Sequence, residues 1–147
     1  MSHHSDSIYN HAAILKLLDV YSTSLGFTPQ HSQYTVLSSF FLTRSSTSTD
    51  VKVISFGTGT KCLPANRLSP KGEIVNDSHA EVLARRSALL WFLEEIQRTC
   101  SVNAYRSPWL DVYSDGRYAL QDGVKLNLYV STVPCKFRKK PYPAYVF

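Results

Sequence analysis

The chain lacks closely spaced cysteines and long apolar segments. Its three cysteines, Cys62, Cys100 and Cys135, lie far apart and include no Cys-x-x-Cys pair. An odd, scattered set of this kind does not build a disulfide framework, so we expect reduced thiols that are buried or bind a metal. The longest strictly apolar run, residues 88–93, is too short to cross a bilayer, so we expect no membrane partner.

The first residues lack the basic and apolar regions of a signal peptide. We therefore expect an intracellular protein, in the nucleus or the cytoplasm, and not a secreted one. Acidic residues are also scarce, with 11 Asp and Glu against 16 Lys and Arg, for a net charge of +5. Four of the basic residues follow Cys135 with no acid among them, so the charge alone is a weak argument for nucleic acid.

The apolar pattern predicts one α/β domain. Hydrophobic residues make up 44% of the 147 positions, as in a chain that forms a core. Residues 6–25 and 78–98 carry apolar side chains at helical spacing. Residues 34–43, 51–56 and 124–131 have the composition or alternation of strands, and the first two predict an antiparallel hairpin. The expected order is helix, β-hairpin, helix, strand.

The same pattern predicts which helix faces are buried. In the first helix we expect Leu15 and Leu18 to face the core, and in the second Leu89 and Leu93, on a broad apolar face. Residues 99–123 show no period and predict an irregular connection.

The residues that carry chemistry lie at the start of the second helix and after the last strand. They are Asn-Asp-Ser-His-Ala-Glu at residues 76–81 and Thr-Val-Pro-Cys at residues 132–135. His79 and Cys135 supply two ligand types of a tetrahedral zinc site, in which a catalytic zinc keeps one corner for water. Glu81 is only two residues from His79, so its better role is proton transfer between that water and a leaving amine.

A structural interpretation of these residues competes with the catalytic one. Ser78 and Glu81 also have the spacing of a capping box, worth about 1 kcal/mol to the helix. Taken singly, a first-turn histidine or a buried cysteine is more often structural than metal-binding. The combination of His-x-Glu on a helix with Pro-Cys after a strand is the first half of the zinc deaminase signature, and it favours the metal site.

Three ordered segments extend this signature. They read Gly-Thr-Gly-Thr-Lys-Cys at 57–62, Asn-Asp-Ser-His-Ala-Glu-Val-Leu-Ala-Arg-Arg at 76–86 and Leu-Tyr-Val-Ser-Thr-Val-Pro-Cys at 128–135. Together they resemble successive motifs of the RNA adenosine deaminase domain, which tRNA-specific adenosine deaminases share with the editing deaminases of double-stranded RNA. The resemblance implies an incomplete cytidine-deaminase-like three-layer fold, with residues 1–135 as the N-terminal part of the deaminase domain and 136–147 as a divergent basic tail.

The resemblance implies zinc-dependent hydrolysis of adenosine to inosine in RNA. His79 and Cys135 would be zinc ligands, and Glu81 the general acid and base acting on a flipped-out adenine. Because no separate module for double-stranded RNA is seen, tRNA is the expected substrate, and DNA is not an expected partner. The oligomeric state stays unknown.

Further positions match the family's binding residues. Thr60 and Lys61 match contacts to the target nucleotide, and Asn76 and Asp77 match polar positions near the zinc. The family also buries inositol hexakisphosphate, and matching positions here are Arg85 and Arg86. The structural alternative for Arg85 is an exposed pair with Glu81. For Arg86, on a helix with so broad an apolar face, we expect a charge turned inward toward a partner.

The match breaks after Cys135. The family continues with Gly-Asp and supplies a second cysteine ligand later, whereas Lys136 and Phe137 follow here and Arg138 stands where a Cys-x-x-Cys deaminase has its next thiolate. We therefore expect a truncated or alternatively spliced product, or a shifted reading frame, with impaired activity. Two alternatives stay open: a non-catalytic short form that binds RNA or a protein partner, and a free-nucleoside cytidine deaminase, which Arg138 disfavours.

Overall fold

The computed structural model describes residues 3–25, 35–44, 50–67, 69–71, 73–101, 105–132 and 145–146. The elements follow in the order α1 (His3–Leu25), β1 (Leu37–Arg44), β2 (Val51–Thr58), β3 (Thr60–Cys62), the 3₁₀ turn η1 (Ala65–Arg67), β4 (Asp77–His79), α2 (Ala80–Ser101), β5 (Leu110–Val112), β6 (Tyr118–Leu120), β7 (Val124–Val130) and β8 (Tyr145–Val146).

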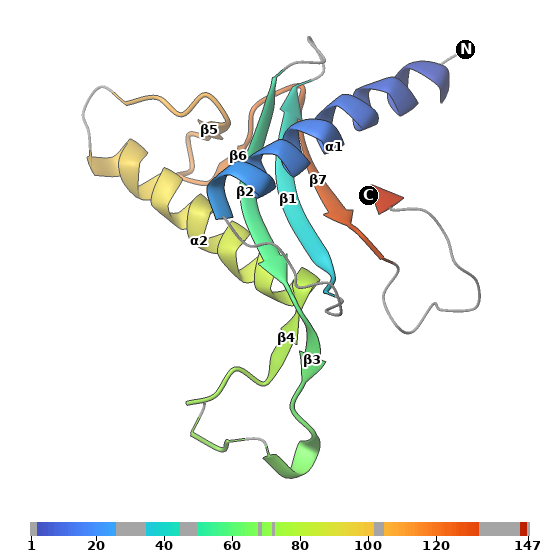
Figure 1. The fold of residues 1–147 in the computed structure, drawn as a ribbon. Coiled ribbons are helices and arrows are strands. Elements are labelled where there is room, and N and C mark those ends of the chain that lie inside the picture. The colour runs from blue at the N-terminus through green and yellow to red at the C-terminus, as the bar shows by residue number, and fades with distance from the viewer. Residues whose placement is uncertain are drawn as a thin grey trace.

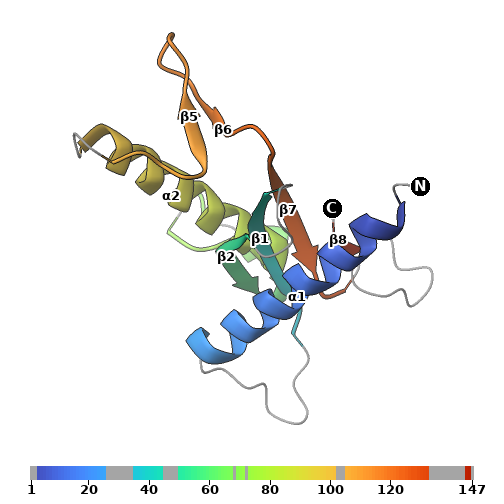
Figure 2. The same cartoon turned by 90° about the horizontal axis from the view of Figure 1, so that it is seen from above.

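Four strands form one antiparallel sheet in the order β2-β1-β7-β8. Leu37 of β1 lies opposite Thr58 of β2, and Ser38 lies opposite Val130 of β7. Helix α1 crosses one face of the sheet and α2 the other, so the sheet is the middle of three layers (Figures 1 and 2). A mixed α/β class with antiparallel strands is therefore confirmed.

Two short ladders add to the predicted order. Strand β3 pairs with β4, and β5 pairs with β6, each antiparallel over three residues. Residues 99–123 were expected to be an irregular connection, and this is wrong where β5 and β6 form a hairpin. Three-residue strands are too short for an alternating pattern to stand out from the sequence.

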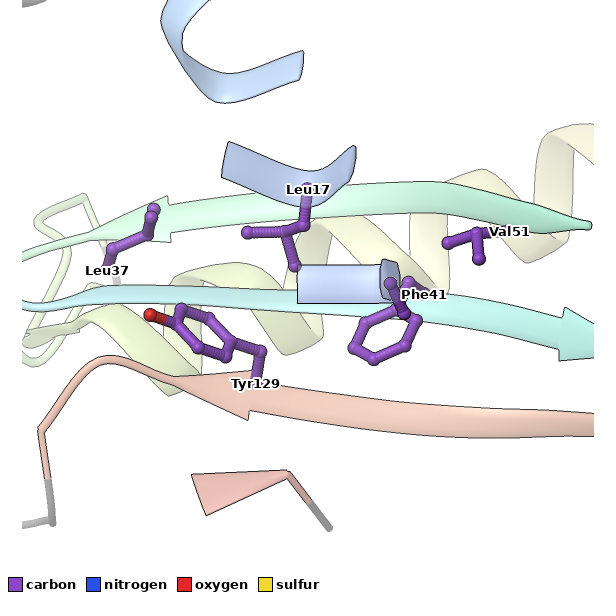
Figure 3. Close-up of a cluster of buried hydrophobic side chains, with 6 residues drawn as sticks. Leu17, Leu37, Phe41, Val51 and Tyr129 are labelled. Carbon is purple, nitrogen blue, oxygen red and sulfur yellow. The ribbon is translucent and has the colours of Figure 1, made fainter. Parts of the chain in front are cut away.

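The core beneath α1 joins the helix to three strands. Ala13 and Leu17 are buried against β1, β2 and β7, together with Phe41, Val51 and Tyr129 (Figure 3). The expected buried face of α1 is wrong, because Leu15 and Leu18 are exposed. Apolar side chains occur around most of this helix, so the sequence pattern does not single out the face that the sheet covers.

Helix α2 lies on the sheet through small side chains. Its buried residues include Ala80, Ala84 and Ala88, at i, i+4 and i+8. At Gly57 of β2, an added Cβ would collide with the Ala80 carbonyl oxygen and lie 2.5 Å from the Ala84 amide nitrogen. The helix backbone therefore sits almost directly on the strand, and a larger residue at this contact would push the two apart.

The expected burial of Leu89 and Leu93 is wrong as a consequence. Both are exposed, Leu93 at 64% of its surface, because the alanine stripe and not the leucine face meets the sheet. Among the described residues neither helix combines the length and hydropathy needed to cross a membrane.

A buried carboxylate fixes the far end of α2. Glu95 is 2% exposed and accepts hydrogen bonds from the hydroxyls of Tyr105, at 2.8 Å, and Ser107, at 2.6 Å. Its other oxygen pairs with Arg98 at 2.7 Å. The pKa of Tyr105 is raised above its ordinary value, mainly by its hydrogen bond to Glu95. Ser107 in turn accepts from the Trp109 and Leu110 amides, so this network holds the start of β5 against α2.

Candidate active site

The candidate site lies where β2 ends against the start of α2. The Gly59 N–H donates to the Val36 carbonyl, and the Ala80 N–H donates to the Gly59 carbonyl, both at 3.1 Å. Gly59 has a φ of 154°, and a side chain there would collide with the Ser78 carbonyl oxygen. The Gly-Thr-Gly segment thus allows a tight joint, from which β3 and β4 leave as a two-stranded ribbon (Figure 1).

His79 is the last residue of β4 and directly precedes α2. Asp77 Oδ1 accepts two hydrogen bonds from it, from the backbone N–H at 2.9 Å and from ring Nδ1 at 2.8 Å. Both bonds lower the pKa of the Asp77 carboxyl below its ordinary value, and the bond from the backbone N–H contributes most. An ionised carboxylate only accepts, so the Nδ1 of His79 carries the proton.

This hydrogen bond determines what the imidazole offers. In the neutral ring the proton on Nδ1 leaves the Nε2 lone pair free, and the histidine side chain is 31% exposed. A carboxylate bonded to the second nitrogen is the usual support of a metal-ligating histidine. His79 therefore fits one corner of a zinc site.

Glu81 is the second residue of α2 and is partly buried. Within the described part of the chain its carboxylate forms no hydrogen bond or ion pair, so neither the capping box with Ser78 nor the pair with Arg85 is present. The turn before α2 is stabilised instead by Asp77, whose carboxylate accepts a hydrogen bond from the backbone N–H of His79. Glu81 is thus a free carboxylate two residues from His79, in the first turn of the helix.

The ribbon register places Thr60 and Lys61 differently. Thr60 pairs with His79 and Lys61 with Ser78. Residues directly opposite each other in an antiparallel pair point to the same face, and neighbours along a strand point to opposite faces. Thr60 therefore shares the face of His79, whereas Lys61 lies on the other face, and both residues are exposed.

Three further candidate residues lie close to His79 in sequence and form no hydrogen bond or ion pair with its ring. Asn76 is exposed, and its carbonyl accepts from the Leu63 amide at 2.8 Å. Arg85 and Arg86 are both exposed, and the positive charge of Arg86 contributes to lowering the pKa of Asp77. The inward charge expected at Arg86 is wrong, because α2 places Ala84 on the sheet and the two residues that follow it turn away.

Cys135 lies outside the described residues. Within the described ranges, no three His, Cys, Asp or Glu side chains are grouped closely enough to hold a metal ion. Cys62 and Cys100 are free, exposed thiols. The described residues thus provide His79 as one candidate ligand, with Asp77 bonded to its ring and Glu81 two residues later in the chain.

The profile of the adenosine-deaminase (editase) domain matches residues 55–136, more than half of the chain. The chain belongs to this family. The editase match includes the joint at Gly59, the β3–β4 ribbon, α2 and Cys135, so it spans every candidate residue named above.

Individual relatives come from both branches of the editase family. The chain is 36% identical over 108 residues to the double-stranded RNA-specific editase Adar of Drosophila melanogaster, covering 71% of this chain and 16% of the relative. It is 30% identical over 115 residues to the mouse double-stranded RNA-specific editase B2, covering 76% and 15%. It is 50% identical over 46 residues to human tRNA-specific adenosine deaminase 1, covering 31% and 9%. The chain spans less than a fifth of the length of these relatives.

The ribbon is the part of the candidate site that sequence reasoning missed. Neither residues 60–62 nor residues 77–79 were predicted to be strands, yet β3 and β4 pair Thr60 with His79. The available signal was the glycine pair before β3 together with Asn-Asp before His79, because both mark turns that can bring two short segments together.

Proposed function

We propose that this chain is part of a hydrolytic RNA adenosine deaminase with a cytidine-deaminase-like three-layer fold, which converts adenosine to inosine with tRNA as its substrate. The observation that carries the proposal is the arrangement at the root of the ribbon. Asp77 holds the His79 ring with Nε2 free, and Glu81, which has no partner among the described residues, follows two residues later. Membership of the editase family, with relatives named for tRNA and for double-stranded RNA, supports an RNA substrate.

The proposed cofactor is zinc, with His79 and Cys135 as ligands. When bound, zinc makes water a stronger acid and so supplies a nucleophile at neutral pH. Glu81 would take one proton from the attacking water and pass it to the ring nitrogen as the C6–O bond forms. It would then move the proton of the new C6 hydroxyl to the amine, so that the C6–N bond breaks and ammonia leaves. Thr60, on the face of His79, would contact the target nucleotide, and Asp77 would keep the ligand ring in its tautomer.

Inositol hexakisphosphate is the second proposed cofactor, bound through Arg85 and Arg86. Both guanidinium groups are exposed and form no ion pair with another described residue. Consecutive positions on a helix point about 100° apart, so the pair would contact separate phosphates and not grip one together. Other basic groups would have to complete such a site.

The test is an inosine assay on the purified 147-residue chain with zinc and unmodified tRNA transcripts, followed by nuclease digestion and mass spectrometry. We expect the wild-type chain to form inosine at an impaired rate, because the second cysteine ligand of the family is missing from it. Glu81→Gln should lose a further factor of about 10² to 10⁴, the order of magnitude that a general acid and base contributes. Glu94→Gln, an exposed acid on the same helix, is the matched control and should retain the activity. If the zinc-loaded wild-type chain forms no inosine, the chain is not a deaminase by itself.

A non-catalytic form that binds RNA is the second candidate. It is favoured by one observation, that the described residues do not bring three metal-ligating side chains together. This candidate predicts salt-dependent RNA binding without bound zinc and without inosine.

A further inference from the structure

The β3–β4 ribbon and the segment that connects its two strands stand away from the helices and the four-stranded sheet (Figure 1), and they include three basic residues. Lys61 is in β3, Arg67 ends η1, and Lys71 follows in the turn beyond it. All three side chains are exposed. We refer to the described residues from 60 to 79 as the arm.

None of these cations is neutralised by a described neighbour. The ion pairs of the described residues lie elsewhere or, in the arm itself, join Asp77 to His79. The acids of the arm are Asp77, which is bonded to His79, and Glu73, which is exposed. At its root the arm continues directly into α2, where Arg85 and Arg86 are also exposed. Three basic side chains without an ion-pair partner among the described residues, on one projecting segment, can bind a polyanion.

The arm has a fixed relation to the candidate site. Its root is held by the bonds of Gly59 to Val36 and Ala80, and farther out the Leu63 amide donates to the Asn76 carbonyl at 2.8 Å. A three-residue strand spans roughly 10 Å, and Arg67 and Lys71 follow the end of β3 in the chain. They are therefore too far out to touch a base at His79, and only nucleotides farther along the same strand would reach them.

We propose that Arg67 and Lys71 bind phosphates of the RNA backbone that flank the target nucleotide, extending the contact expected of Lys61. The inference rests on the proposed function, since it takes RNA as the molecule that reaches His79. The two residues contribute affinity and orientation without reading sequence, because phosphate contacts are independent of the base.

The test measures binding of the 147-residue chain to a short single-stranded RNA as a function of salt concentration. Each lost phosphate contact should reduce the slope of log affinity against log salt by about 0.7, so Arg67→Gln with Lys71→Gln should reduce it by about 1.4. The same slope predicts an affinity loss of roughly 25-fold at 0.1 M salt. The matched control is Lys52→Gln with Lys125→Gln, which removes two exposed lysines from β2 and β7 and should leave the slope unchanged.

Circular dichroism of both double variants would establish that they remain folded. An unchanged slope in the arm variant, an equal loss in the control variant, or no RNA binding by the wild-type chain would each overturn the proposal. Its failure is distinguishable from that of the proposed function. Inosine formation with unaffected binding would overturn only the role of the arm, whereas arm-dependent binding without inosine would support the arm and contradict deamination by this chain.

Discussion

Asp77 Oδ1 accepts hydrogen bonds from both the backbone N–H and the ring Nδ1 of His79, at 2.9 and 2.8 Å. One carboxylate oxygen thereby fixes the backbone turn before α2 and the tautomer of the candidate ligand. Two residues that are only two positions apart in sequence thus connect the local backbone turn to the chemistry proposed for the site.

Asp77→Asn should weaken the hydrogen bond that fixes the tautomer of the His79 ring. An amide oxygen still accepts a hydrogen bond but carries no charge, so the preference for a proton on Nδ1 becomes weaker. Nitrogen chemical shifts of His79 should show a predominantly Nδ1-protonated neutral ring in the wild-type chain and a more even mixture in the variant. Zinc affinity should fall about 10- to 100-fold. Asp111→Asn changes an exposed acid of β5 and should alter neither quantity.

Gly57→Ala should destabilise the joint between β2 and α2. The added Cβ would meet backbone atoms of Ala80 and Ala84, which cannot move aside as a side chain can. We expect the free energy of unfolding to decrease by about 1–3 kcal/mol, measured by denaturant titration. Because Ala80 follows His79, the resonances of the His79 ring should shift as well. An unchanged unfolding curve would contradict the close contact of helix and strand.

Glu95→Ala should be among the more damaging substitutions on α2. It removes the shared acceptor of Tyr105 and Ser107, and leaves the Ser107 hydroxyl, 3% exposed as a residue, without that partner. The expected loss is about 2–4 kcal/mol in the free energy of unfolding. Glu94→Ala, the adjacent exposed acid, should stay within about 0.5 kcal/mol. Similar values for the two variants would show that the network does not stabilise the fold.

The sequence predicted the long elements and misjudged their faces. The hairpin of β1 and β2, strand β7 and both helices agree with the periodicity, because each is long enough to show a repeat. The face of α2 was missed since Ala84 and Ala88 are weak hydrophobic signals, and their small size matters only once Gly57 lies opposite. Burial of Glu95 was also out of reach, because its partners Tyr105 and Ser107 come from a segment without a period.

For the site, the motif order led directly to the family, whereas the geometry required the structure. Nothing in the spacing shows that Asp77 bonds the His79 ring, or that Thr60 lies opposite it across a ribbon. The role of Cys135 as a zinc ligand stays a prediction.

X-ray absorption spectroscopy of the zinc-loaded chain would identify the atoms bound to the metal. If His79 and Cys135 are ligands, the spectrum should show one bound zinc with nitrogen at about 2.0 Å and sulfur at about 2.3 Å. The sulfur signal should disappear in Cys135→Ser and persist in Cys62→Ser and Cys100→Ser, and His79→Ala should release the metal. A chain that retains no zinc, or one that keeps its sulfur ligand in Cys135→Ser, would show that these two residues do not form a zinc site.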